Sequence, residues 1–175
     1  MNSPASRKGK VPGVRLFEMR QIEEPGRGCL TVGGFARDMP FTPRRFFLTC
    51  EVPEGKTRGN HAHRRCQQVL ICVHGACWVR VDDGVESEEW YLDSPAFALL
   101  IPPLIWAVET LCSPDSILLV FASRDYEPED YISNYDEFRA IAIAERQSRD
   151  LEARFPDKSP EAGERSTRES VNYCA

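Results

Sequence analysis

Two of the three histidines of the chain lie two residues apart, in the segment RGNHAHRR. In a β-strand, residues i and i+2 project from the same face, so His61 and His63 would point in the same direction. An imidazole titrates near neutral pH and also binds metals, so the pair could transfer protons or hold a metal ion. The alternative is a pair of surface histidines in a polar loop.

The residues around this pair have a characteristic spacing. Gly55 precedes His61 by six positions, Gln68 follows His63 by five, and Gly75 lies seven further on. This arrangement resembles the first cupin motif, G-x5-HxH-x4-E-x6-G, with glutamine in place of the usual glutamate. The resemblance implies a cupin jelly roll in which the two histidines point into a β-barrel.

The second cupin motif usually ends in a third metal-binding histidine, and Ala107 stands at that position, in IPPLIWAVET. Two of the four usual ligands would therefore be replaced, by Gln68 and Ala107. Two neutral imidazoles rarely hold a divalent metal tightly without a carboxylate or a further histidine. We therefore expect no metal cofactor, and histidines that are free for acid–base chemistry.

The middle of the chain consists of short apolar or alternating runs that predict β-strands. Turn signals separate them, among them the hairpin signal Asp83-Gly84. Strands at such close spacing favour a sandwich or barrel, so the expected fold class is all-β, a cupin jelly-roll β-barrel. The runs are RFFLTCEV, QVLICVHG, ACWVRVDD, EEWYLD, AFALLIPP, WAVETLC and ILLVFAS.

One later segment has a different period. Between residues 130 and 155, apolar residues recur three or four positions apart, which predicts one C-terminal α-helix packed on the barrel. Residues 1–13 predict a flexible arm and residues 153–175 a polar, disordered tail, so the cupin domain should cover residues 14–152. The apolar positions of the helical segment are Tyr131, Tyr135, Phe138, Ile141, Ile143 and Leu151.

Composition excludes several classes of function. The net charge of −5 argues against general affinity for nucleic acid or anionic membranes. The N-terminus lacks the apolar region of a secretory signal, and no apolar run approaches the length of a membrane span. Seven cysteines are scattered without a CxxC pair, which favours free thiols in a reducing cytoplasm. We expect a cytoplasmic protein that binds neither nucleic acid nor membrane.

Three longer segments resemble one enzyme family. RGNHAHRRCQQVLICVHGACWVRVDDG, LDSPAFALLIPPLIW and ASRDYEPEDYISNYDEF, within residues 14–138, are similar to the sugar 3,4-ketoisomerases, which are RmlC-like cupins. The resemblance implies a metal-independent isomerase that moves the keto group of a dTDP-4-keto-6-deoxyhexose from C4 to C3, in deoxyamino-sugar biosynthesis. It implies His61 and His63 as catalytic residues, and Arg58 and Arg27 at the substrate and nucleotide site. It also implies a homodimer with exchanged N-terminal strands.

The implied reaction suits a pair of imidazoles. A base must remove the C3 proton, which the neighbouring carbonyl acidifies, and the resulting enediol must then be protonated at C4. One base and one shuttle for the hydroxyl protons suffice. We expect His61 to act as the carbon base and His63 as the shuttle.

Three more residues are candidates for binding the substrate. Gln68 would face the same pocket and hydrogen bond the substrate, and Trp106 would form the pocket wall or stack on the nucleotide base. Arg45, with its neighbour Arg44, could bind the pyrophosphate, although a solvated surface pair is the alternative.

Departures from the family pattern leave other reactions open. Phe46-Phe47, Gly33-Gly34 and Ala107 replace residues common in the family, which leaves the sugar stereochemistry undetermined. The alternatives are a nucleotide-sugar epimerase, a metal-dependent cupin dioxygenase and a non-catalytic cupin that binds nucleotide sugars. Epimerases of this type usually add a tyrosine acid and a His–Asp relay, for which the sequence shows no clear counterpart.

Overall fold

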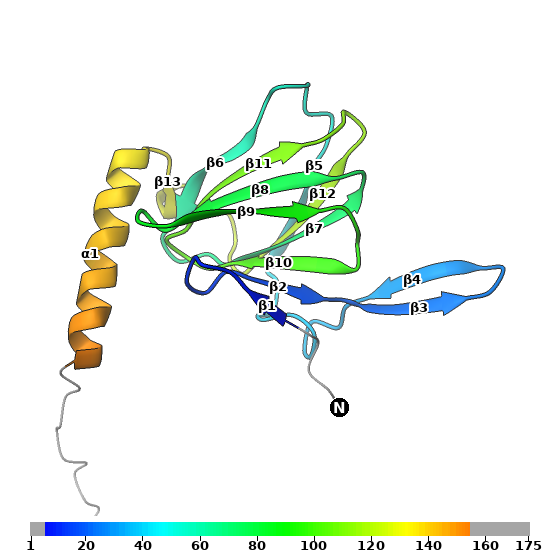
Figure 1. The fold of residues 1–175 in the computed structure, drawn as a ribbon, viewed down its shortest axis with the longest axis horizontal. Helices are drawn as coiled ribbons and strands as arrows, with labels where there is room; N and C mark the ends of the chain where they lie inside the picture. Colours follow the sequence, from blue (N-terminus) through cyan, green and yellow to red (C-terminus); the bar gives the residue numbers. More distant parts are fainter. Residues whose placement is uncertain (1–5, 155–175) are drawn as a thin grey trace, which may run out of the picture.

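The computed structural model describes residues 6–154, which form two β-sheets, a separate β-hairpin and one long helix (Figure 1). The strands are β1 (Ser6–Lys8), β2 (Arg15–Glu18), β3 (Arg20–Glu24), β4 (Gly28–Val32), β5 (Arg45–Thr49), β6 (Arg58–His63), β7 (Gln68–His74), β8 (Cys77–Asp82), β9 (Ser87–Leu92), β10 (Phe97–Ile101), β11 (Trp106–Leu111), β12 (Ile117–Ala122) and β13 (Tyr131–Ile132). A short 3-10 helix, η1 (Pro128–Asp130), precedes β13, and α1 (Tyr135–Arg154) follows it.

The two sheets enclose the main apolar core. The first has the strand order β1-β2-β10-β7-β12-β5 and the second β13-β6-β11-β8-β9, with antiparallel pairing in both. Strand β8 shows how the sequence builds them: Val79 and Val81 are buried, whereas Trp78 and Arg80, which alternate with them, are exposed. The predicted all-β jelly roll with one C-terminal helix is confirmed, although its described strands form two sheets rather than one continuous barrel.

The fold begins earlier than the sequence predicts. Strand β1 pairs with β2, and Val11 is buried in the core between the sheets. The carboxylate of Glu88 accepts hydrogen bonds from the backbone N–H groups of Lys10 and Val11, which fixes this segment. The prediction of a flexible arm over residues 1–13 is therefore wrong from residue 6 onward, because one buried valine and backbone pairing outweigh a polar composition.

Helix α1 is shorter at its start than its apolar pattern suggests. Tyr131 and Ile132 belong to β13, which pairs with His63 and Ala62 of β6. The helix begins after Asn134, whose side-chain oxygen accepts a hydrogen bond from the N–H of Glu137. Figure 1 shows the helix standing at one side of the sheets. Three of its residues, Phe138, Ile141 and Ala142, pack against Ala62, Trp106 and Ile132.

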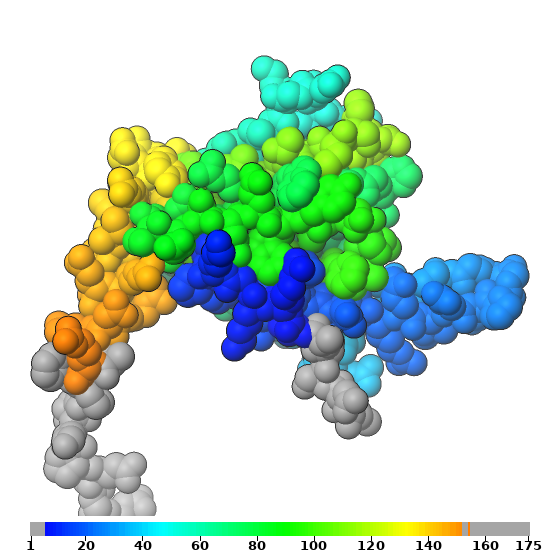
Figure 2. Space-filling view, viewed as in Figure 1, coloured from blue at the N-terminus to red at the C-terminus, as the bar shows by residue number. Residues whose placement is uncertain are grey.

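Two parts of the chain project from this body (Figure 2). Among the described strands, β3 and β4 pair only with each other, and their hairpin extends beyond the sheets. The C-terminal half of α1 extends in another direction. Within residues 6–154, no helix combines the length and apolarity needed to cross a membrane. The helix continues to Arg154, and the remainder of the predicted tail lies outside the described residues.

Candidate active site

Strand β6 places both histidines on the inner face of the second sheet. Ala62 between them packs against helix α1 on the outer face, so its two neighbours point the opposite way. The ring centroids of His61 and His63 lie 5.0 Å apart, with the rings nearly perpendicular. The structure thus brings the pair together, and His63 is only 5% exposed. The alternative of two surface histidines in a loop is excluded.

Buried hydrogen bonds fix the tautomer of His63. Its Nδ1 lies 3.0 Å from Oδ2 of Asp130, which is 3% exposed, and its Nε2 lies 3.2 Å from the side-chain nitrogen of Gln68. An ionised carboxylate only accepts hydrogen bonds and an amide NH2 only donates them. Nδ1 therefore carries the proton, and the Nε2 lone pair accepts from Gln68.

Asp130 is held as a carboxylate by several donors. Besides His63, the backbone N–H groups of Arg65 and Cys66 donate to it, at 2.9 and 3.2 Å. Burial raises the pKa of Asp130, but the hydrogen bonds from His63, Cys66 and Arg65 outweigh it, so the pKa lies below the usual range of the group. An ionised Asp130 then orients the imidazole of His63.

His61 is oriented by its own strand. Its Nδ1 donates to the carbonyl oxygen of Gly59 at 3.0 Å, which leaves the Nε2 lone pair free to accept a proton. Gly59 has a φ of +74°, and a Cβ there would lie 2.6 Å from the carbonyl oxygen of Ala107. Only glycine fits this conformation and this close approach, so Gly59 is needed for the placement of His61.

Both imidazoles are held in the neutral form. Burial lowers the pKa of His61, and the positive charge of Arg45 lowers it further, against the hydrogen bond to Gly59. Burial together with neighbouring His61 lowers the pKa of His63 to about 4, although Asp130 acts in the opposite direction. Neutral imidazoles near pH 7 are proton acceptors, so the arrangement is suited to general base chemistry.

Tyr131 and Arg45 complete the immediate surroundings of the pair. The ring centroid of Tyr131 lies 4.9 Å from that of His61 and 4.4 Å from that of His63. Its hydroxyl accepts a hydrogen bond from Nη2 of Arg45 at 2.9 Å. Arg45, a candidate pyrophosphate ligand from the sequence, therefore lies beside the histidines rather than on a solvated surface.

The residues around the pair do not fit a cupin metal site. Gln68 and Ala107 occupy the places of a carboxylate and a third imidazole. Another trio, His63, Cys66 and Asp130, brings its ligand atoms within 4.8 Å of one another. However, the two oxygens of that carboxylate already accept hydrogen bonds from four N–H groups. The donor set is thus committed to hydrogen bonding, and a reaction without metal stays a prediction.

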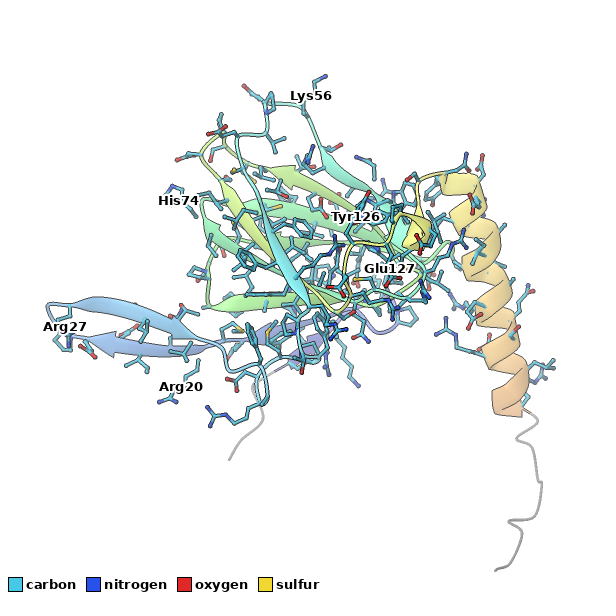
Figure 3. The ribbon with its side chains drawn as sticks, turned by 180° about the vertical axis from the view of Figure 1, so that it is seen from behind. Arg20, Arg27, Lys56, His74, Tyr126 and Glu127 are labelled. Atoms are coloured by element: carbon cyan, nitrogen blue, oxygen red, sulfur yellow. The ribbon has the colours of Figure 1, made fainter. Side chains whose placement is uncertain are left out.

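The other predicted binding residues lie in different places. Trp106 packs against Tyr135 and Phe138 on the helix side of β11, so the prediction that it forms the pocket wall is wrong. Alternation along β11 turns Ala107 inward instead. Arg27 lies at the tip of the β3–β4 hairpin, remote from Tyr126 beside the site (Figure 3), with a side chain that is 79% exposed. Its role in nucleotide binding stays a prediction.

Arg58 begins β6, and its cross-strand neighbour on β11 is Glu109. This carboxyl is buried, and burial raises its pKa to about 7 while Arg58 lowers it. An oxygen of Glu109 lies against Gly59, where an added Cβ would meet it at 2.8 Å. The sequence offered no signal for this inward-facing acid, because it lies within a run that reads as an ordinary strand.

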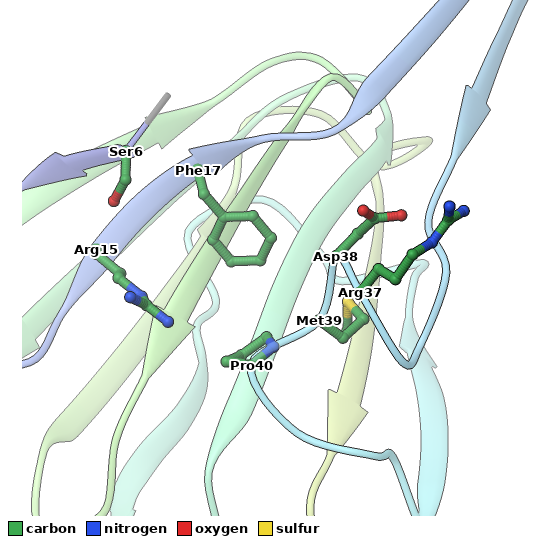
Figure 4. Close-up of a pocket in the computed structure, with 7 residues that line it drawn as sticks. All are labelled: Ser6, Arg15, Phe17, Arg37, Asp38, Met39 and Pro40. Atoms are coloured by element: carbon green, nitrogen blue, oxygen red, sulfur yellow. The ribbon is translucent and has the colours of Figure 1, made fainter. Parts of the chain in front are cut away.

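A cavity of about 230 Å³ lies elsewhere, between β1, β2 and the segment that precedes β5 (Figure 4). Arginine and apolar side chains line it, but none of them belongs to the histidine site. The cavity is therefore separate from the candidate active site. Its lining residues are Ser6, Arg15, Phe17, Arg37, Asp38, Met39 and Pro40.

The jelly roll and the oriented, neutral histidines define a cupin with a proton-transfer site. The family model FdtA, described as WxcM-like, C-terminal, matches residues 12–143, and the chain belongs to this family. The TDP-4-oxo-6-deoxy-alpha-D-glucose-3,4-oxoisomerase of Aneurinibacillus thermoaerophilus is 37% identical over 113 residues, which cover 65% of this chain and 81% of that enzyme. The predicted family resemblance is thereby confirmed.

Solved structures support the same assignment. QdtA, a sugar 3,4-ketoisomerase from Thermoanaerobacterium thermosaccharolyticum in complex with TDP, is 32% identical with a TM-score of 0.74, over 77% of this chain and 98% of QdtA. WlaRB, a TDP-quinovose 3,4-ketoisomerase from Campylobacter jejuni, is 32% identical with a TM-score of 0.70, over 74% and 99%. The RmlC epimerase of Mycobacterium tuberculosis, at 16% identity and a TM-score of 0.63, shares the fold.

Proposed function

We propose that this protein is a 3,4-ketoisomerase that moves the keto group of a TDP-4-keto-6-deoxyhexose from C4 to C3. The observation that carries the proposal is the pair of neutral imidazoles, each with its Nδ1 proton committed and an Nε2 lone pair that can accept a proton. The names of the similar enzymes support the substrate class, and a His-to-Asn variant of QdtA is known in complex with TDP-4-keto-6-deoxyglucose.

The proposed reaction proceeds through an enediol. Nε2 of His61 takes the C3 proton, and the electron pair of the C3–H bond forms a C3–C4 double bond as the carbonyl oxygen takes a proton from a neighbouring donor. His63 then relays the C3 hydroxyl proton back to that donor, the C3 carbonyl forms, and His61 returns its proton to C4. Asp130 keeps His63 in one tautomer throughout, and Gln68 hydrogen bonds its Nε2 until substrate arrives.

We also propose a homodimer with exchanged N-terminal strands. Leu30 of the projecting hairpin is 59% exposed, and Phe46 on strand β5, at the edge of the first sheet, is 68% exposed. An exposed leucine on the projecting hairpin and an apolar sheet edge on one molecule favour association with a second copy. A partner's hairpin on this edge would bring its Arg27 toward the nucleotide. A cytoplasmic location agrees with the six free cysteines among the described residues.

The test is incubation with TDP-4-keto-6-deoxyglucose in D2O. We expect a 3-keto product, which carries deuterium at C4 where the Nε2 proton of His61 exchanges with solvent before its return, and loss of turnover in His61→Asn and in His63→Asn with TDP binding retained. His74→Asn is the matched control, because His74 is exposed at the end of β7 and pairs with Asp115 (Figure 3). Near-wild-type activity in both site variants would refute the mechanism.

A second candidate is a nucleotide-sugar epimerase. The sequence showed no counterpart to the tyrosine acid and His–Asp relay of such enzymes, but Tyr131 and the His63–Asp130 pair supply both group types. In the same experiment an epimerase would place deuterium at C3 and C5 and keep the 4-keto group. TDP binding with neither a 3-keto product nor deuterium exchange would instead indicate a non-catalytic sugar-nucleotide-binding cupin.

A further inference from the structure

The ketoisomerase steps proposed above give Tyr131 no role. Strand β13 pairs it with His63, and its ring contacts both imidazoles. It is only partly exposed, and its ring centroid lies 4.9 Å and 4.4 Å from the centroids of the two imidazoles. A side chain held only for packing would leave its hydroxyl to solvent or to a backbone group. Here the hydroxyl faces a charged side chain instead.

That charged side chain is Arg45. Its Nη2 donates to the Tyr131 hydroxyl, so the phenol oxygen accepts from a cation and keeps its own proton free to donate. The guanidinium lies 5.6 Å from the ring centroid of Phe47 and 5.5 Å from that of Tyr126, which restricts its orientation. Arg45 forms no ion pair with any residue in the range 6–154, so its charge is available to stabilise a phenolate.

The histidine pair leaves one proton unassigned. When C3 loses its proton, the carbonyl oxygen on C4 gains negative charge and needs a donor. Neither neutral imidazole has a proton to give, because both Nδ1 protons are committed to Gly59 and Asp130. The Gln68 amide can hydrogen bond but does not transfer its proton. The Tyr131 hydroxyl lies on a ring in contact with both imidazoles, and it can donate a proton and be restored.

We propose that Tyr131 is a further catalytic residue, whose hydroxyl, held by Arg45, protonates the C4 oxygen of the substrate as His61 removes the C3 proton. This inference rests on the proposed ketoisomerase function. The C3–H electron pair forms the C3–C4 double bond, and the former carbonyl oxygen takes the phenol proton. The C3 hydroxyl then returns a proton to the phenolate through His63, the C3 carbonyl forms, and C4 takes the proton from His61. Each residue ends as it began.

The test compares Tyr131→Phe, which keeps the ring and removes only the hydroxyl, with Tyr126→Phe as the matched control. Tyr126 contacts Arg45 only through its ring face and is exposed. We expect kcat of Tyr131→Phe to fall about 100-fold or more, with KM and TDP affinity changed less than about threefold, and Tyr126→Phe to stay within about threefold of wild type. Washout of deuterium from substrate labelled at C3 should fall in parallel with kcat, because both proton transfers belong to one step.

A second variant keeps the result decisive. Arg45→Gln should lower kcat in the same direction, and the double variant with Tyr131→Phe should be no slower than the slower single variant, because the two groups act as a unit. Washout or turnover near the wild-type rate in Tyr131→Phe would overturn the inference, as would additive losses in the double variant. Absence of a 3-keto product with the wild-type protein would instead refute the ketoisomerase proposal itself.

Discussion

The two imidazoles reach the same protonation state by different means. Asp130 fixes the tautomer of His63 from the side, whereas a carbonyl of the same strand fixes that of His61. In both rings the proton lies on Nδ1, and burial disfavours a second proton. Both imidazoles therefore remain available as bases in weakly acidic solution.

This state predicts the pH dependence of catalysis. A base whose pKa is lowered stays unprotonated, and therefore active, at pH values below the ordinary histidine pKa of about 6.5. With the pKa of His63 at about 4 and that of His61 lowered, kcat/KM should remain level as the pH falls through 6.5 and decline only in more acidic solution. A pH–rate profile measures this, and an acid limb centred at 6.5 or above would contradict it.

A variant of Asp130 tests whether its charge orients His63. In Asp130→Asn the remaining side-chain oxygen can still accept from the backbone N–H of Arg65, but the charge that orients His63 is lost, and the amide NH2 would face Nδ1 of His63 and the N–H of Cys66. We expect kcat to fall by about 100-fold or more with a smaller change in KM, because the proton would move to Nε2. Nitrogen-15 NMR of the imidazoles would report the tautomer. An unchanged kcat would show that the orientation of His63 does not depend on this charge.

The backbone at the start of strand β6 determines where His61 lies. We expect Gly59→Ala to destabilise the fold by about 2 kcal/mol or more, because the residue has a positive φ and the methyl group would meet backbone. Gly55→Ala is the matched control: it has the same φ of +74°, but no atom lies within 4 Å of the added group. Chemical denaturation measures both, and equal losses would show that the close contact at Gly59 has no energetic effect.

Elements with a clear period could be predicted from the sequence, and their ends could not. The alternation in β6 and the HxH spacing placed both histidines correctly on one face. The apolar spacing of the last segment also included Tyr131, although EPED before it and SN after it interrupt the helix. Pairing with β6 holds Tyr131 in a strand, and this tertiary contact has no local signature. Asp130 and Tyr131 were missed as site residues for that reason.

One residue that is predicted to bind the nucleotide lies far from the active site of its own chain. Arg27 lies at the tip of the projecting hairpin, and the hairpin pairs with no other described strand. Exchange of this hairpin between two copies would let Arg27 of one molecule complete the site of the other. In that arrangement the functional unit is the dimer, and each site contains residues of both chains.

Subunit complementation tests this arrangement. Arg27→Ala and His61→Asn chains, each with a different tag, should be nearly inactive alone when assayed well below KM. Coexpressed at equal levels, they should recover about a quarter of wild-type activity, because half of the dimers are mixed and each mixed dimer contains one complete site. If Arg27 served its own chain, every site in a mixed dimer would lack one group and no activity would return. If the hairpins are exchanged, mixed dimers purified through both tags should have about half the wild-type activity per dimer. A monomer by light scattering would refute the exchange outright.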